Sequence, residues 1–246
     1  MSTRIISIDG LDGAGKSTLA ESAKAWFTQK DLNFFDTTAW SKQHHRLPTL
    51  EDVGEADVLL TAEPTHVGIG AAIRTIILPP GSTYSAQQCA AAYALDRDVL
   101  YQQLIHPFIV AKPNGWILQE RGLIASLAYQ PLQSLRNRDS DPLTTEQVLA
   151  LPGNQTALRH VPTLFFFVDI DAELAQQRLH GRRGHIAEDI FDDQSFQTAL
   201  RERYQLPEVT NPWTSRGTRI ITLDGSQTKE QITQAMYKYL DELTVN

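Results

Sequence analysis

The sequence has very little cysteine and no long apolar run. One cysteine, Cys89, stands among 246 residues, so no disulfide can form within the chain, which favours a reducing compartment. Apolar runs such as residues 164–168 are far too short to cross a bilayer. The first residues lack the pattern of a signal peptide. We therefore expect a cytoplasmic protein that does not bind membranes.

Positive charge is also in short supply. The chain carries 22 lysines and arginines against 29 aspartates and glutamates, which gives a formal net charge of -7. A general nucleic-acid binder needs basic surface to displace counterions, so we expect no nucleic-acid partner. An acidic chain can still hold a small anion in a local basic pocket.

Short β-branched or apolar runs alternate with segments of helical apolar spacing along the chain. This alternation is typical of a parallel sheet with helices on both faces, so it predicts an α/β protein. Since no internal repeat or low-complexity linker interrupts the pattern, we expect a single domain over residues 1–246. The segment 41–57 is polar and predicts an irregular surface excursion, and the segment 132–160 carries no motif. The expected strands are residues 4–8, 33–38, 58–61, 116–119, 164–168 and 219–223, and the expected helices are residues 17–29, 69–78, 85–109 with a kink near Pro107, 123–130, 172–180, 193–204 and 229–243.

A glycine-rich segment follows the first expected strand at once. Residues 10–17 match the P-loop pattern G-x-x-x-x-G-K-[ST] and lead into an expected helix, as a P-loop requires. The glycines allow a tight turn whose N–H groups, with the positive end of the helix, can surround phosphate oxygens. Lys16 would bring a positive charge to the transferred phosphate, and the Ser17 hydroxyl is suited to bind Mg²⁺. The motif predicts a P-loop NTPase fold that binds ATP through Gly10, Gly13, Ala14, Gly15, Lys16, Ser17 and Thr18.

The P-loop alone does not distinguish a kinase from an assembly ATPase or a non-catalytic nucleotide sensor. A guanine signature, Asn-Lys-x-Asp, is absent. The strand-end carboxylate expected of an ATPase has two candidates, Glu120 and Asp169. An ATPase therefore stays open on this motif alone.

Two other segments suit a second nucleotide. Tyr93 and Arg97 are four residues apart, so they share one face of an expected helix. There a ring can stack on a base while a guanidinium bonds the edge of that base. Glu120 and Arg121 follow an expected strand, at the edge of the sheet where open α/β proteins bind ligands. A plain ATPase needs no such second pocket.

Together with the P-loop, these segments resemble the thymidylate kinase family from Ile5 to about Tyr204. Three positions depart from the family pattern: Ala62 replaces an arginine, Glu120 an aspartate and Gly122 a tyrosine. The resemblance implies substrate contacts from Asp12 in the P-loop, Glu63 and Pro64, Arg74 as a substitute for the missing arginine, Tyr93, Arg97, Glu120, Arg121, Ser126, Tyr129 and Gln130.

The resemblance also implies which part of the acceptor nucleotide each of these residues contacts. Asp12 would position it, and Arg121 would clamp its phosphate with two parallel hydrogen bonds. Tyr93 would stack on thymine, and Arg97 would bond the carbonyl edge of that base.

The resemblance implies that other residues of the same set contact the sugar and bind the metal. Tyr129 would line the sugar and help to reject a ribose 2′-hydroxyl, while Ser126 would face the base. Glu120 would hold a Mg²⁺-bound water or the sugar, so it joins Ser17 as a candidate metal ligand.

A cluster of arginines and glycines predicts a small lid over about residues 178–193. Arginines on a hinged loop can fold over ATP and neutralise charge on the transferred group. The family keeps a catalytic arginine either in the P-loop or in the lid. Because the P-loop position holds Gly13, the resemblance implies that Arg182 or Arg183 is catalytic, and the choice between them stays open.

The predicted activity is therefore a phosphoryl transfer, ATP + dTMP giving ADP + dTDP, in the synthesis of deoxynucleotides. Its catalytic residues would be Asp12, Lys16, Arg121 and the lid arginine, with Mg²⁺ as cofactor. The resemblance also implies a homodimer. The alternatives are a kinase for another deoxynucleoside monophosphate and a non-catalytic P-loop protein.

Overall fold

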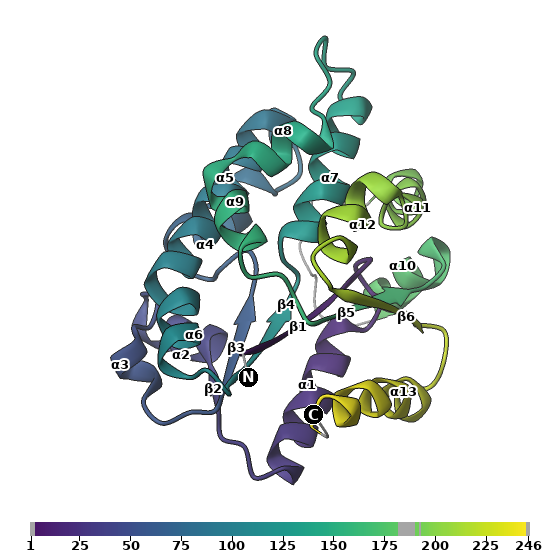
Figure 1. Cartoon of the computed structure of the whole chain (residues 1–246). Coiled ribbons are helices and arrows are strands. Elements are labelled where there is room, and N and C mark those ends of the chain that lie inside the picture. Colours follow the sequence, from purple (N-terminus) through teal and green to yellow (C-terminus); the bar gives the residue numbers. More distant parts are fainter. Residues whose placement is uncertain (1–2, 182–189, 192, 245–246) are drawn as a thin grey trace.

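The fold is built on one six-stranded sheet. The computed structural model describes residues 3–181, 190–191 and 193–244 of the chain. All paired strands in this part of the chain run parallel, in the order β2-β3-β4-β1-β5-β6 (Figure 1). The strands are β1 (Arg4–Gly10), β2 (Phe34–Asp36), β3 (Val58–Ala62), β4 (Trp116–Glu120), β5 (Leu164–Asp169) and β6 (Arg219–Asp224). This architecture confirms the predicted α/β fold.

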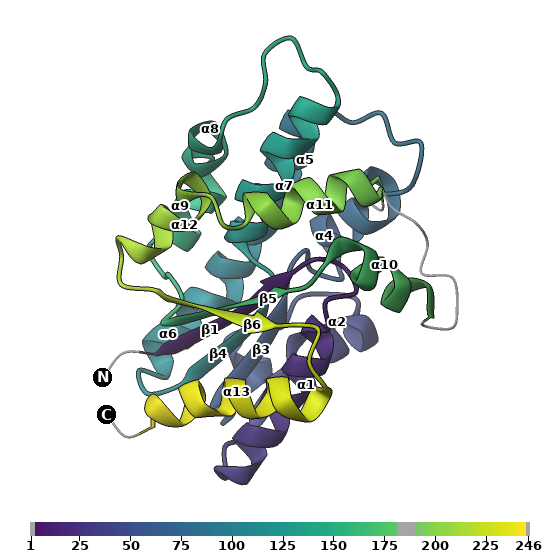
Figure 2. The ribbon, with the colours of Figure 1, turned by 90° about the vertical axis from the view of Figure 1, so that its right-hand side faces the viewer.

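Helices cover both faces of the sheet, because its central strands are apolar on both sides. Figure 2 shows α1 and α13 on one face, and α7, α11 and α12 on the other. These helices are α1 (Lys16–Gln29), α13 (Lys229–Glu242), α7 (Leu123–Arg136), α11 (Gln194–Arg203) and α12 (Pro207–Thr214). The remaining helices are α2 (Thr37–His44), α3 (Leu50–Val53), α4 (Gly68–Ala72), α5 (Ala86–Leu100), α6 (His106–Ala111), α8 (Thr145–Ala150), α9 (Pro152–Leu158) and α10 (Ala172–Gly181), with two π-helical turns, η1 (Ile73–Ile77) and η2 (Tyr101–Ile105).

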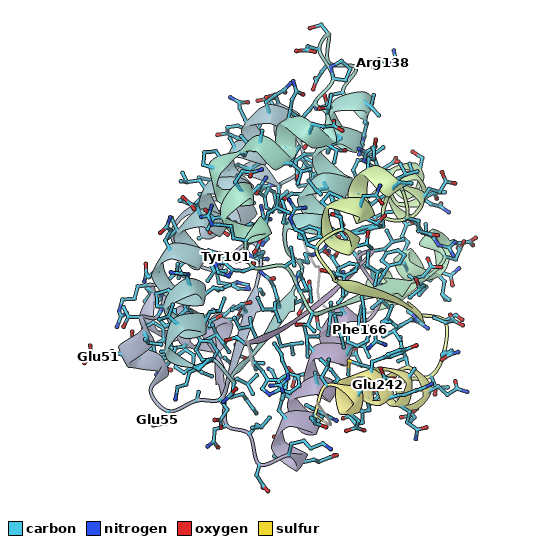
Figure 3. The ribbon with its side chains drawn as sticks, viewed as in Figure 1. Glu51, Glu55, Tyr101, Arg138, Phe166 and Glu242 are labelled. Atoms are coloured by element: carbon cyan, nitrogen blue, oxygen red, sulfur yellow. The ribbon has the colours of Figure 1, made fainter. Side chains whose placement is uncertain are left out.

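Aromatic side chains fill the core between the sheet and its helices. Trp26 and Phe27 on α1 lie edge to face against Trp116 on β4, with ring centroids 5.6 and 5.7 Å from that of Trp116. Phe166 on β5 lies inside, against α13, while Glu242 points outward from the ribbon (Figure 3). The loops that follow the strands gather at the carboxyl edge of the sheet, where Ile8 and Ala62 both pair with Glu120.

The long helix predicted over residues 85–109 is interrupted. It is α5, then the π-helical turn η2, then α6, so the departure from α-helix begins before the predicted kink at Pro107. Proline lacks an N–H group and clashes with the carbonyl of the residue four positions earlier, and a π-helical turn accommodates both effects.

The prediction for residues 41–57 is wrong, because capped helices occupy part of this segment. α2 begins after Asp36, whose Oδ1 accepts a hydrogen bond from the N–H of Ala39 at 3.0 Å. It also shortens the expected strand at 33–38 to β2. α3 begins at a capping box in which Thr49 and Asp52 bond each other's backbone N–H groups.

The segment 132–160 is also mostly helical. α7 continues through Pro131 to Arg136, whereas the expected helix ended at residue 130. α8 begins at a capping box of Thr144 and Gln147, and α9 begins at Pro152, the first helical position that proline favours. This arrangement brings α9 against α5, on the wall of the site described next.

Candidate active site

A cavity of about 530 Å³ lies at the carboxyl edge of the sheet. In register, Ala62 at the end of β3 and Ile8 near the end of β1 both pair with Glu120 at the end of β4, so these strands finish side by side. The cavity brings together Asp12, Gly13, Gly15, Lys16, Ser17, Glu63, Pro64, Arg74, Tyr93, Arg97, Glu120, Arg121, Ser126, Tyr129 and Gln130. Of the other predicted residues, Gly10, Ala14 and Thr18 belong to the P-loop segment but do not contribute to this wall.

The P-loop has a conformation that only glycine adopts readily. Gly10, Gly13 and Gly15 have φ angles of 149°, 82° and 100°. A Cβ atom at Gly13 would lie 2.0 Å from the carbonyl oxygen of Ala175 on α10, so a side chain has no room there. α1 begins after Gly15 without a side-chain cap, which leaves its first N–H groups for an anion.

Lys16 folds back over the P-loop. Its Nζ donates hydrogen bonds to the carbonyl oxygens of Gly10 and Leu11, at 3.1 and 2.7 Å. Burial and the nearby charge of Arg121 lower the pKa of Lys16, while Asp12 and Asp9 oppose that shift. A buried ammonium in this position is a ready counter-charge for a phosphate.

Asp12 and Arg121 form an ion pair across the cavity floor. Arg121 Nη2 donates to Asp12 Oδ1, and Lys16 Nζ lies 3.4 Å from the same oxygen. Burial alone would raise the pKa of Asp12, but Arg121 and Lys16 outweigh it and hold that pKa well below its usual range. Asp12 is therefore a carboxylate fixed between two cations.

A second carboxylate, Asp9, also contacts Arg121, and it was not among the residues predicted from the sequence. Its Oδ1 accepts hydrogen bonds from Tyr204 Oη at 3.0 Å and from Arg121 Nη1 at 3.3 Å. Burial raises the pKa of Asp9, with Arg121 and Lys16 opposing. The position of Asp9 directly before Gly10 was a signal in the sequence. Tyr204 gave none, because it reaches Asp9 from the end of α11.

Ser17 and Glu120 meet at the rim of the same cavity. Ser17 Oγ donates to Glu120 Oε1 at 3.0 Å, which places a hydroxyl and a carboxylate oxygen together. Mg²⁺ commonly takes one or two protein oxygens and completes its shell with water and substrate phosphates. No cluster of three metal-binding side chains occurs among the described residues, and a Mg²⁺–nucleotide site does not need one. The oxygen pair fits the predicted metal.

A buried polar network in the cavity wall is organised around Arg97 on α5. This side chain is 1% exposed and makes an ion pair through Nη2 with Glu63 Oε2 at 2.6 Å. Nη2 also donates to Ser126 Oγ at 3.0 Å, and Nη1 donates to Asn154 Oδ1. Burial raises the pKa of Glu63, against the opposing charge of Arg97. Glu63 is thus turned toward Arg97, and Asn154 is a partner that the sequence did not reveal.

The remaining predicted residues line the space around this pair. Tyr93 is half-buried on the same helix as Arg97, as the four-residue spacing predicted. Arg74 donates to the carbonyl oxygens of Pro64 and Thr65 at 2.5 and 3.2 Å, so it is tied to the loop after β3. Tyr129 Oη lies 3.4 Å from Asp12 Oδ2. Gln130 has a buried Oε1 without a hydrogen-bond partner in the described part of the chain.

The lid prediction falls largely outside the described residues, which exclude Arg182 and Arg183. Arg178 is described, and its Nη1 donates to the carbonyl oxygen of Gly225 at 2.6 Å. Leu179 and Phe191, at either end of the predicted lid, line the cavity.

A P-loop, a carboxylate–hydroxyl pair and an arginine-lined second pocket in one cavity define a P-loop kinase that acts on a small molecule. The comparisons with known proteins agree. The family model described as "Thymidylate kinase" matches residues 46–236, and the chain belongs to this family. The chain is 26% identical to "Thymidylate kinase" of Blochmanniella pennsylvanica, with 98% of this chain and 96% of that protein covered. It is also 26% identical to "Thymidylate kinase" of Halothermothrix orenii (94% and 93% covered) and 28% identical to "Probable thymidylate kinase" of Thermococcus onnurineus (81% of each).

The structure also bears on membrane association. Among the residues that the structure describes, no helix combines the length and the apolar character that a membrane span requires.

Proposed function

We propose that this chain is a thymidylate kinase, which transfers the γ-phosphoryl group of ATP to dTMP and releases ADP and dTDP. The family assignment supports an ATP-dependent nucleoside monophosphate kinase that uses Mg²⁺. The observation that carries the proposal is the single cavity in which the P-loop faces both Arg121 and the pocket of Tyr93 and Arg97. An enzyme that transfers a phosphoryl group from one nucleotide to another needs to hold both nucleotides with their phosphates close together.

ATP binds through its phosphates on the P-loop. The uncapped start of α1 presents N–H groups to the β- and γ-phosphates, and Lys16 places its charge beside them. Ser17 and Glu120 would hold Mg²⁺, which neutralises charge that develops on the transferred group.

The phosphate of dTMP lies on Arg121. The guanidinium is held by Asp9 and Asp12 on one side and stands over the ring of Tyr129, 5.5 Å from its centroid. A planar fork fixed in this way can donate hydrogen bonds to two phosphate oxygens at once. Arg74, near the same end of the cavity, supplies a further positive charge in place of the arginine absent at Ala62.

The base lies between Tyr93 and α7. Tyr93 stacks on the ring, and Arg97, which has only N–H donors, faces a carbonyl oxygen. The orphaned Oε1 of Gln130 suits the N3–H donor of thymine. Ser126 faces the base edge from α7, and Tyr129 lies at the level of the sugar.

Transfer then requires alignment more than covalent chemistry. The acceptor phosphate oxygen attacks the γ-phosphate in line, and the protein offsets the repulsion between two anions with Lys16 and Arg121. Asp12 is already ionised and holds Arg121 toward the P-loop. We assign the remaining cation to Arg182 or Arg183, in agreement with the family resemblance.

Three further proposals concern the context of the enzyme. The family resemblance supports a homodimer, and the single cysteine supports a cytoplasmic location. The net charge of -7 supports the absence of a nucleic-acid partner. We also propose that residues 1–246 form one kinase domain with a lid at about residues 178–193.

A coupled assay of ADP release across all nucleoside monophosphates, at fixed ATP and Mg²⁺, tests the proposed function. We expect dTMP to give the highest kcat/KM. A preference for dCMP, dGMP or dUMP would move the enzyme to another deoxynucleotide, and ATP hydrolysis without an acceptor would make it an ATPase.

A further inference from the structure

The wall behind Arg97 contains a helix, α9, that supplies none of the predicted ligand contacts itself. α9 packs along α5, the helix that carries Tyr93 and Arg97. A Cβ atom at Gly153 would lie 1.9 Å from the carbonyl oxygen of Ala94, so the absence of a side chain allows the two backbones to approach closely. One residue further on, Asn154 reaches Arg97 directly.

The orientation of the Asn154 amide is fixed by its two partners. Its Nδ2 donates to the carbonyl oxygen of Val148 at 2.6 Å, which leaves Oδ1 to face Arg97 Nη1. Asn154 is fully buried. A flipped amide would set an N–H donor against a guanidinium and a carbonyl oxygen against a carbonyl oxygen, so only one orientation satisfies both neighbours.

Asn154 bonds a different nitrogen of Arg97 from the one that Glu63 and Ser126 contact. Glu63 and Ser126 both bond Nη2, so neither of them holds Nη1. The bond from Nη1 to Asn154 adds a second fixed point and therefore sets the plane of the group. Nε of Arg97 is buried and has no hydrogen-bond partner within the described chain.

We propose that Asn154 is a positioning residue that fixes the plane of Arg97 and so makes the acceptor site selective for a base with a carbonyl oxygen at the contacted edge. The inference rests on the proposed function, because it assumes that the pocket takes a pyrimidine base. A guanidinium held in one plane donates to the oxygen at position 4 of thymine. Cytosine presents an amino group at this position. The N–H donors of cytosine and of Arg97 would then face each other, and neither would have an acceptor.

The test compares substitutions that remove the oxygen facing Arg97 with substitutions that leave it in place. Asn154→Ala and Asn154→Leu both remove the acceptor from Arg97, and leucine keeps most of the volume, so it carries the test if the alanine variant does not fold. Asn154→Asp keeps an oxygen facing Arg97 in either protonation state. Thr156→Val is the matched control, because it removes a 2.9 Å hydrogen bond from α9 to Asp98 on α5 without touching Arg97.

The measurements are KM for dTMP, KM for ATP and the ratio of kcat/KM for dTMP over dCMP, with Tm for each variant. For Asn154→Ala and Asn154→Leu we expect KM for dTMP to rise about tenfold or more and the selectivity ratio to fall by a similar factor, since a hydrogen bond to a charged group is lost. KM for ATP should not change. Asn154→Asp and Thr156→Val should lower Tm and keep the selectivity ratio within about threefold of wild type.

An unchanged selectivity ratio in a folded Asn154→Leu enzyme would overturn the inference, and so would an equal loss of selectivity in Thr156→Val. Failure of the proposed function has a different signature, because the wild-type enzyme would then transfer no phosphate to dTMP. Calorimetric binding of dTMP and dCMP to the same proteins reports base selectivity apart from transfer, so the two failures stay distinguishable.

Discussion

Replacement of Arg121 by alanine removes the side chain that we place on the acceptor phosphate. In the structure this guanidinium bonds Asp12 and lies 3.3 Å from Asp9, and both partners hold it beside the P-loop. Each charge-assisted hydrogen bond to a phosphate oxygen contributes about 1.5–3 kcal/mol. Loss of a two-pronged clamp therefore removes about 3 kcal/mol or more of transition-state stabilisation, and each 1.4 kcal/mol is a factor of about ten in rate.

We expect Arg121→Ala to lower kcat/KM for dTMP at least about a hundredfold. The coupled ADP-release assay measures it, and circular dichroism checks that the variant folds. Arg121→Lys should fall between wild type and alanine, because lysine keeps the charge but loses the planar fork. Arg216→Ala is the control, since this arginine is exposed just after α12 and its Nη1 donates to the carbonyl oxygen of Pro212. Near-normal turnover in a folded Arg121→Ala enzyme would refute the assignment.

Three further predictions follow from single contacts. Ser17→Ala should raise the Mg²⁺ concentration for half-maximal activity several-fold and leave KM for dTMP unchanged, as a Mg²⁺ titration would show, because a metal ligand is lost. Gly13→Ala should weaken ATP binding by calorimetry at least about tenfold, since its φ is 82° and its Cβ would meet the carbonyl oxygen of Ala175. His66→Gln should flatten the dependence of Tm on pH. Burial, together with the charges of Arg74 and Lys42, lowers the pKa of His66 from its ordinary 6.5 to about 4. The contribution of neutral His66 to stability is therefore complete above pH 6.5 and is lost as pH falls toward 4. Parallel Tm curves for wild type and His66→Gln between pH 4 and 7 would contradict this shift.

The sheet and the P-loop could be predicted from the sequence because both depend on local patterns. Each expected strand appears in the sheet, since an apolar run bounded by turn residues has few other structures open to it. The P-loop glycines have positive φ angles, which suit the predicted tight turn. Tyr93 and Arg97 line one cavity because residues four apart share a helix face.

The helices of residues 41–57 and 132–160 were missed, although their signals were present. Thr49 and Asp52, and Thr144 and Gln147, have the three-residue spacing of capping boxes. These helices are short, so their apolar periodicity spans too few turns to be recognised. In such short segments, the spacing of capping residues indicates where a helix begins more clearly than apolar periodicity does.

The partners of Arg97 and Arg121 show what the sequence cannot reveal. Asn154 lies 57 positions from Arg97, and Tyr204 lies 195 positions from Asp9. No local pattern connects residues at such separations, because the contact depends on how α9 packs on α5 and on how α11 ends near β1. The sequence predicted groups that line the cavity, and the structure adds the groups that hold them.

A crystal structure with ADP and dTMP bound tests the central claim most directly. The account predicts the β-phosphate of ADP on the backbone N–H groups of the P-loop and the phosphate of dTMP on Arg121, with thymine between Tyr93 and Arg97. A dTMP molecule bound outside this cavity, or an Arg121 side chain turned away from the P-loop in the complex, would contradict it.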